Sequence, residues 1–128
     1  MRSVMTRFAV LTMTLWLTGS VQAADSQGNY AIWGMGNQSC NAYNNSREKD
    51  NTEDFKYYVM GYLTAYNVHQ QETYSISSAT PMPEIMSWLD EFCGSHQVHS
   101  FENAMKNYIG EHYKERMKVA PSSSSYGR

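Results

Sequence analysis

Apolar side chains recur every three or four residues in four stretches of the chain, and this spacing predicts four amphipathic helices. The clearest helix begins near residue 53. Asn51 or Thr52 can cap it, and the acids Glu53 and Asp54 suit the positive end of its dipole. Its apolar positions are Phe55, Tyr58, Val59, Tyr62, Leu63 and Tyr66.

The opposite side of this helix carries the small residues Gly61, Thr64 and Ala65. Small side chains leave room for a second neighbour, because another helix can approach them closely. We therefore expect this helix to lie at the centre of the bundle, with neighbours on both sides.

The first and fourth helices each follow a serine that can act as an N-cap. Ser39 precedes a short helix that runs from Cys40 to about Glu48, and Ser100 precedes a helix that runs to about Arg116. The inner face of the fourth helix consists of Phe101, Ala104, Met105, Tyr108 and Ile109.

The third helix opens within residues 80–84, because proline is tolerated in the first turn of a helix. We expect Gly94 to end it as the residue after the C-cap. Its apolar face consists of Ile85, Trp88, Leu89, Phe92 and Cys93.

Two segments outside the helices are predicted to be extended. Residues 24–37 form an N-terminal arm, and we expect the aromatic rings of Tyr30 and Trp33 to dock on the core. Residues 72–78 alternate apolar and hydroxylic side chains, so they can pair with residues 30–32 as a short two-stranded ribbon.

These elements predict an all-α protein with one helical domain, a small four-helix bundle that covers residues 24–118. Beyond it, residues 119–128 contain a proline and a run of serines with few apolar side chains. We expect this tail to be disordered.

The N-terminal residues 1–23 have the pattern of a secretory signal peptide. Arg2 and Arg7 make the first seven residues basic, and an apolar run follows. Small side chains then precede a cleavage site between Ala23 and Ala24. A buried N-terminal helix or an uncleaved anchor is the alternative. Cleavage would leave a periplasmic or secreted domain that does not insert into a membrane.

The charge balance adds little attraction for polyanions. The chain has 10 basic and 12 acidic residues, and both arginines of the predicted signal peptide would be lost on cleavage. A mildly acidic domain disfavours nucleic acid and anionic lipid as partners, since both require a clustered basic face.

The chain contains two cysteines, Cys40 and Cys93. In an oxidising compartment such a pair predicts a disulfide, with two free thiols or a metal pair as the alternative. His96 and His99 follow Cys93 with the spacing Cys-x-x-His-x-x-His, so they are weak candidates for zinc or copper. We found no nucleophile–base pair or phosphate loop, and we expect no cofactor and no enzyme activity.

Tyrosine is abundant, with ten residues in a chain of 128. Four of them fit none of the predicted apolar faces: Tyr43, Tyr57, Tyr74 and Tyr113. Tyrosine is enriched in protein interfaces, so these residues predict a binding surface or a homodimer face. Ordinary surface tyrosines are the alternative.

Several short motifs between Trp33 and about Arg116 resemble those of small exported bacterial helical proteins. These motifs are Trp33-Gly34, Ser39-Cys40-x-x-Tyr43, Tyr58-Val59-x-Gly61-Tyr62-Leu63-x-x-Tyr66-Asn67, Trp88-Leu89-Asp90-x-Phe92-Cys93 and Ser100-Phe101-x-x-Ala104. The resemblance is to two groups. One is the Tai-type immunity proteins, which block peptidoglycan-amidase effectors of type VI secretion, and the other is the periplasmic acid-stress chaperone HdeA.

This resemblance implies an HdeA-like layout, in which one disulfide joins the start of the first helix to the end of a later one. It also implies two functions that need no catalytic residue. The first is an immunity or inhibitor protein that binds another exported protein, and the alternative is a chaperone that loosens in acid and covers unfolded clients.

Overall fold

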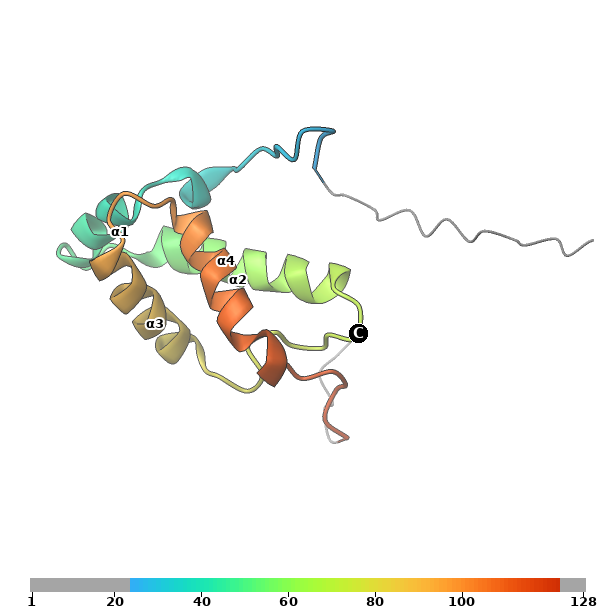
Figure 1. Ribbon diagram of the computed structural model, residues 1–128. Helices are drawn as coiled ribbons and strands as arrows, with labels where there is room; N and C mark the ends of the chain where they lie inside the picture. The colour runs from blue at the N-terminus through green and yellow to red at the C-terminus, as the bar shows by residue number, and fades with distance from the viewer. Residues whose placement is uncertain (1–23, 123–128) are drawn as a thin grey trace, which may run out of the picture. The chain divides into compact units, whose positions relative to one another are not determined.

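A computed structural model describes residues 24–122 of the chain, so the predicted signal peptide and most of the tail lie outside the described residues. Four α-helices occupy the described part (Figure 1): α1 (Cys40–Arg47), α2 (Glu53–His69), α3 (Met82–Ser95) and α4 (Phe101–His112). Two short 3-10 helices, η1 (Gly34–Asn37) and η2 (Tyr113–Glu115), flank them. The all-α prediction of a small helical bundle is therefore confirmed.

The chain divides after Tyr30. Among residues 24–30, Asp25 closes a small turn by accepting hydrogen bonds from the backbone amides of Gln27 and Asn29 at 2.9 and 2.8 Å. These bonds favour the carboxylate, Asn29 most strongly, and they lower the pKa of Asp25. All four α-helices belong to the unit that begins at Ala31.

Both predicted serine caps are present, and they lie side by side. The Ser39 hydroxyl accepts from the amide of Ala42 and the Ser100 hydroxyl from the amide of Asn103, each at 3.1 Å. Ser39 and Ser100 also form an isolated antiparallel bridge, which aligns the first turns of α1 and α4. The predicted helix starts are therefore confirmed, and they are joined to each other.

The predicted disulfide is confirmed and connects α1 to α3. Cys40 is the first residue of α1, Cys93 lies in the last turn of α3, and their sulfurs are bonded at 2.02 Å. Both cysteines are fully buried. The cross-link closes a loop with a sequence separation of 53.

Three aromatic rings from different helices meet in the core. The ring centroid of Tyr43 lies 5.0 Å from that of Phe55 and 4.8 Å from that of Phe101, and the last two rings are also 4.8 Å apart. Such tilted and edge-on contacts stabilise beyond the area they bury. The remaining buried positions are aliphatic or sulfur-containing side chains for the most part.

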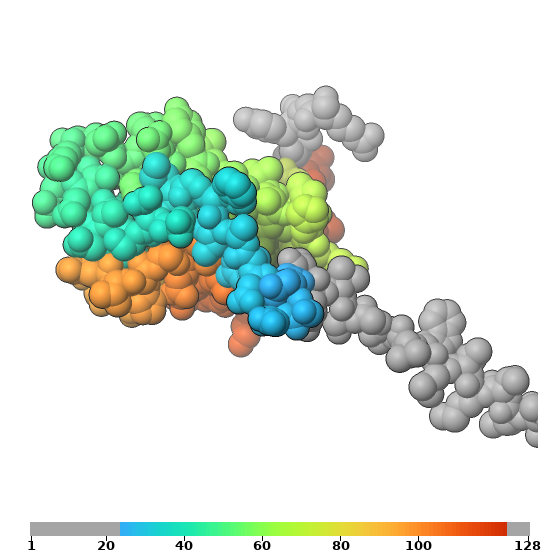
Figure 2. Space-filling view, turned by 90° about the horizontal axis from the view of Figure 1, so that it is seen from above, coloured from blue at the N-terminus to red at the C-terminus, as the bar shows by residue number. Residues whose placement is uncertain are grey.

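The helix α2 is not the centre of the bundle, contrary to the prediction. The backbone of α4 lies close to α1, α3 and η1, whereas α2 makes its main backbone contact with η1. In Figure 2 the cyan segment that contains η1 lies against the green atoms of α2. The small residues Gly61, Thr64 and Ala65 are exposed. The apolar row of α2 packs on the core through Phe55, Val59 and Leu63, and no helix within residues 24–122 covers its other side.

The segment of residues 72–78 pairs with a different part of the chain from the one predicted. Ser75 pairs with Met117, not with residues 30–32, through two backbone hydrogen bonds of 2.9 and 3.1 Å. This pairing places Ile76 in the core with 0% exposure, and the amide of Ile76 donates to the Asn67 side chain at 2.8 Å. The segment after α4 therefore holds the connection between α2 and α3.

Three smaller expectations are also corrected. Trp33 does not dock on the core, because 82% of it is exposed. Gly94 lies inside the last turn of α3, which ends at Ser95, and α4 ends at His112 before the backbone tightens into η2. Helix ends defined by propensity alone commonly shift by a residue or two.

A close contact between η1 and α2 depends on one glycine. Gly36 is buried, and a methyl group added at its Cα would overlap the phenol ring of Tyr58 on α2. A substitution Gly36→Ala must push this ring aside, so we expect it to lower the free energy of unfolding by about 1–3 kcal/mol in urea unfolding.

The matched control is Gly110→Ala, because Gly110 lies exposed in α4 with no atom near the added methyl group. In an exposed helix alanine should stabilise by about 0.5–1 kcal/mol relative to glycine. Equal effects of the two substitutions would contradict the packing of η1 on α2.

Candidate functional site

A groove of about 910 Å³ lies among α1, the start of α2 and α3. We call it the α1–α3 groove. Its lining residues are Tyr43, Asn44, Arg47, Glu48, Asp50, Thr52, Glu53, Lys56, Met82, Pro83, Met86, Asp90, Gly94 and Gln97. It is the candidate binding site because it combines apolar and charged side chains on elements that the disulfide connects.

The regular spacing of helix residues places the lining of the groove. Met82, Met86 and Asp90 are four residues apart, so they project from one side of α3. Tyr43 and Arg47 are likewise one turn apart on α1. The two helices thus present a methionine surface and a polar cluster to the same space.

The polar cluster is centred on the carboxylate of Asp90. The Tyr43 hydroxyl donates to Asp90 Oδ1 at 2.6 Å, and Arg47 Nε forms an ion pair with the same oxygen at 2.9 Å. The Asn44 side chain donates to the backbone carbonyl of Cys93 at 3.0 Å. Three polar contacts therefore reinforce the covalent link between α1 and α3.

Burial raises the pKa of the Tyr43 hydroxyl well above its ordinary value, and the hydrogen bond to Asp90 acts in the same direction. The neutral hydroxyl is therefore the stable form of Tyr43 across the physiological range, and it serves as a donor to Asp90. Burial also raises the pKa of Tyr108, while the neighbouring hydroxyl of Thr80 opposes the shift.

The charged lining of the groove contains four acids and two bases. Arg47 pairs with Asp90, and Lys56 pairs with Glu53 at 3.5 Å. Within the described residues, Glu48 and Asp50 form no ion pair. The side of the groove next to the turn between α1 and α2 is therefore acidic.

The four tyrosines singled out from the sequence do not form one surface. Tyr43 is 1% exposed and packs in the core, although it also borders the α1–α3 groove. Tyr57 on α2 and Tyr74 in the connection before α3 are 63% and 43% exposed. Among the residues that the structure describes, no ring contact joins any two of the four.

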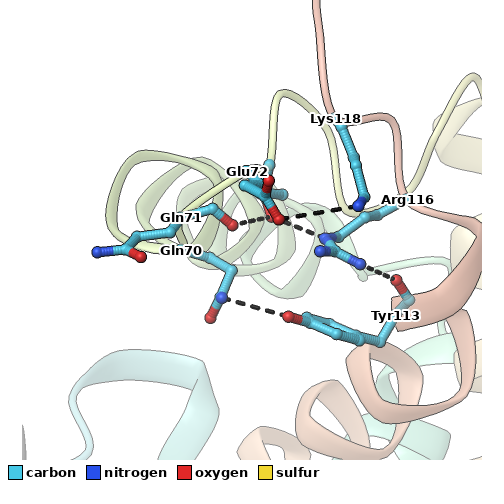
Figure 3. Close-up of polar contacts among 7 residues, drawn as sticks. Gln70, Gln71, Glu72, Tyr113, Arg116 and Lys118 are labelled. Atoms are coloured by element: carbon cyan, nitrogen blue, oxygen red, sulfur yellow. Dashed lines mark hydrogen bonds and ion pairs between the residues drawn. The ribbon is translucent and has the colours of Figure 1, made fainter. Parts of the chain in front are cut away.

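Tyr113 is instead part of a polar cluster at the end of α4 (Figure 3). Gln70 donates to its hydroxyl at 3.4 Å, and the Arg116 guanidinium lies 4.0 Å from the centre of its ring. Arg116 also donates to Thr73 at 3.1 Å, and Lys118 lies 3.8 Å from Glu72. These contacts fasten the segment after α4 to the connection that follows α2.

The two weak metal candidates have neighbours but no third ligand. The rings of His96 and His99 are 5.3 Å apart. Their Nδ1 atoms contact the Phe92 carbonyl and the Asn103 side chain at 2.8 and 2.7 Å. Cys93 is in the disulfide. Across residues 24–122, no group of three His, Cys, Asp or Glu side chains is placed to hold a metal ion.

An aromatic stack along α3 was not foreseen from the sequence. The rings of Trp88 and Phe92 are stacked at 5.4 Å, and those of Phe92 and His96 at 4.2 Å. The spacing of four residues was visible, but Trp88 and Phe92 were assigned to the core. They are only partly buried and border the core instead.

Comparisons with known proteins provide no relative on which a function could rest. No protein-family model matches the chain. No curated protein and no solved structure matches it either. No helix among the described residues is both long enough and apolar enough to cross a bilayer.

The raised tyrosine pKa values predict loss of stability in alkali. Unfolded tyrosines ionise near pH 10, whereas buried Tyr43 and Tyr108 resist ionisation while the protein is folded. The stability that these two tyrosines contribute is therefore fully present below about pH 10. Above it, each buried tyrosine should lower the unfolding free energy by about 1.4 kcal/mol per pH unit.

Absorbance at 295 nm and far-UV circular dichroism, recorded through the same titration, test this expectation. The last tyrosinate signal should appear together with loss of helix. Tyr43→Phe should flatten the fall of stability above pH 10, whereas Tyr57→Phe, at an exposed position, should leave it unchanged. Full tyrosine ionisation with helices intact would contradict the burial of these hydroxyls.

Proposed function

We propose that the protein is a non-enzymatic, periplasmic or secreted binding protein, in the manner of an immunity or inhibitor protein. Its partner is another exported protein, and the α1–α3 groove holds an exposed segment of that partner. The observation that carries the proposal is the methionine-lined groove with an acidic rim, set between helices that a disulfide connects.

The lining of the groove supports a protein segment as its occupant. Met82 and Met86 provide a flexible and polarisable surface that adapts to irregular apolar side chains. Glu48 and Asp50 at the rim favour lysine or arginine on the partner. The best occupant is therefore a partner loop in which a basic residue neighbours an apolar one.

The cross-linked frame supports specific binding. The disulfide and the contacts of Asp90 hold α1 against α3 before the partner arrives. A preorganised surface loses less conformational entropy on association than a mobile one. Export of the chain agrees with the disulfide, because such bonds persist in oxidising compartments.

The proposal is tested by the double substitution Glu48→Gln/Asp50→Asn. Asparagine is chosen at Asp50 because that residue has a φ of 51°, which asparagine tolerates. The purified wild-type protein is immobilised as bait and exposed to periplasmic extract of the native host. Binding of the captured partner is then measured by surface plasmon resonance. We expect one stoichiometric partner, and a decrease of about tenfold in its association rate with the double variant.

The control is Glu91→Gln/Glu115→Gln, which removes two exposed acids outside the groove and so gives the same net charge. It should bind the partner as the wild type does. Equal loss in both variants, or no stoichiometric partner at neutral pH, would contradict the groove as a binding site.

An acid-stress chaperone is the second candidate, and one structural observation favours it. Two carboxylates connect different helices: Asp90 accepts from Tyr43, and buried Glu102 accepts from Tyr62 at 3.1 Å. Each carboxylate thus joins two helices, as in a fold that an acid-loosened chaperone would need. Repeating the capture near pH 3 separates the two functions, since a chaperone would retain many unfolded proteins in acid and none at neutral pH.

A further inference from the structure

One side of α2 is exposed and apolar over several turns. Its residues recur every three or four positions: Tyr57, Met60, Gly61, Thr64, Ala65 and Val68. We call this row the α2 stripe. Tyr57, Met60 and Val68 are 63%, 46% and 73% exposed.

The α2 stripe lacks the charges that a solvated helix face normally carries. Residues 57–68 contain no Asp, Glu, Lys or Arg. The hydroxyl of Thr64 donates to the Met60 carbonyl at 2.8 Å, so its hydrogen bond is made within its own helix. A continuous apolar face of this kind is typical of a surface that binds another protein.

The centre of the stripe is small, and no neighbour among the described residues requires this. No atom lies within 4 Å of the position that a methyl group at Gly61 would occupy. Glycine inside a helix is less stable than alanine, and it is favoured where another chain approaches closely. The small centre therefore suits the close approach of a second helix.

We propose that the occupant of the α2 stripe is a second copy of this chain, packed antiparallel about a two-fold axis. The axis passes near residues 62 and 63. In this arrangement Tyr57 faces Val68, Met60 faces Ala65, and Gly61 faces Thr64. Each pair places a larger side chain over a smaller one, which is the condition for close packing of two helices.

The charges at the two ends of α2 favour the antiparallel arrangement. The acids Glu53 and Asp54 lie at its N-terminal end. At its C-terminal end the two bases Arg116 and Lys118 lie around the acid Glu72 in the cluster of Figure 3, which leaves that end with an excess of positive charge. An antiparallel pair brings the acidic end of one copy to the basic end of the other, whereas a parallel pair would bring acids together.

The length of the stripe sets the strength of the dimer. Twelve helical residues extend over about 18 Å, so the contact falls short of the roughly 800 Å² per partner that a stable interface buries. The dimer is therefore reversible, with a dissociation constant in the micromolar range. None of the stripe residues lines the α1–α3 groove, so the dimer does not rest on the proposed function.

Sedimentation velocity of the full chain, expressed for export and purified with its disulfide intact, tests the dimer. Between about 1 and 500 µM we expect the weight-average mass to rise from one copy toward two. Thr64→Arg, which inserts a long charged side chain at the centre of the stripe, should raise the dissociation constant at least tenfold. Ser87→Arg is the matched control, because Ser87 is exposed on α3, and it should dimerise as the wild type does.

Two results would overturn the proposal. One is a wild-type protein that stays monomeric at 500 µM, and the other is equal dimerisation of Thr64→Arg with its helix content intact by circular dichroism. The groove variant Glu48→Gln/Asp50→Asn should dimerise normally, so failure of the dimer and failure of the proposed partner site are separate outcomes.

Discussion

The bond between Cys40 and Cys93 fixes the first residue of α1 against the last turn of α3, and the rest of the fold is arranged around this junction. The Ser39–Ser100 bridge brings α4 to the same end, and the rings of Tyr43, Phe55 and Phe101 connect α1, α2 and α4 beneath it. A domain of this size buries little apolar surface, so a covalent constraint on the unfolded chain contributes a large share of its stability.

The same junction explains where the molecule can bind. The α1–α3 groove lies between the two cross-linked helices, and its shape is therefore held before any partner arrives. The helix α2 is attached differently. Its inner row packs on the core and on η1, while no helix in the part of the chain that the structure describes covers its outer row. One structure thus offers two distinct surfaces, an acidic groove and an apolar helix face.

Local patterns in the sequence predicted the four helices, the serine caps and the disulfide, because each depends on residues that lie close together or on one cysteine pair. These local patterns failed where the structure depends on contacts between segments that are distant in the sequence. The partner of Ser75 is Met117, which no local alternation indicates. Helix α1 is too short to show a periodicity, so Tyr43 was assigned to the surface. The small residues of α2 predicted a second neighbouring helix, but they are exposed among residues 24–122. The groove combines three elements separated in sequence, and its acids resemble ordinary surface charges.

Equilibrium urea unfolding with and without reductant tests the central claim most directly. The closed loop has a sequence separation of 53. A loop of this length predicts that reduction lowers the free energy of unfolding by about 4 kcal/mol, a large part of the roughly 5–10 kcal/mol expected for a small domain. The reduced protein should then keep about 1–6 kcal/mol of stability and unfold at a clearly lower urea concentration than the oxidised one. A reduced protein that unfolds at the same urea concentration as the oxidised one would contradict the account.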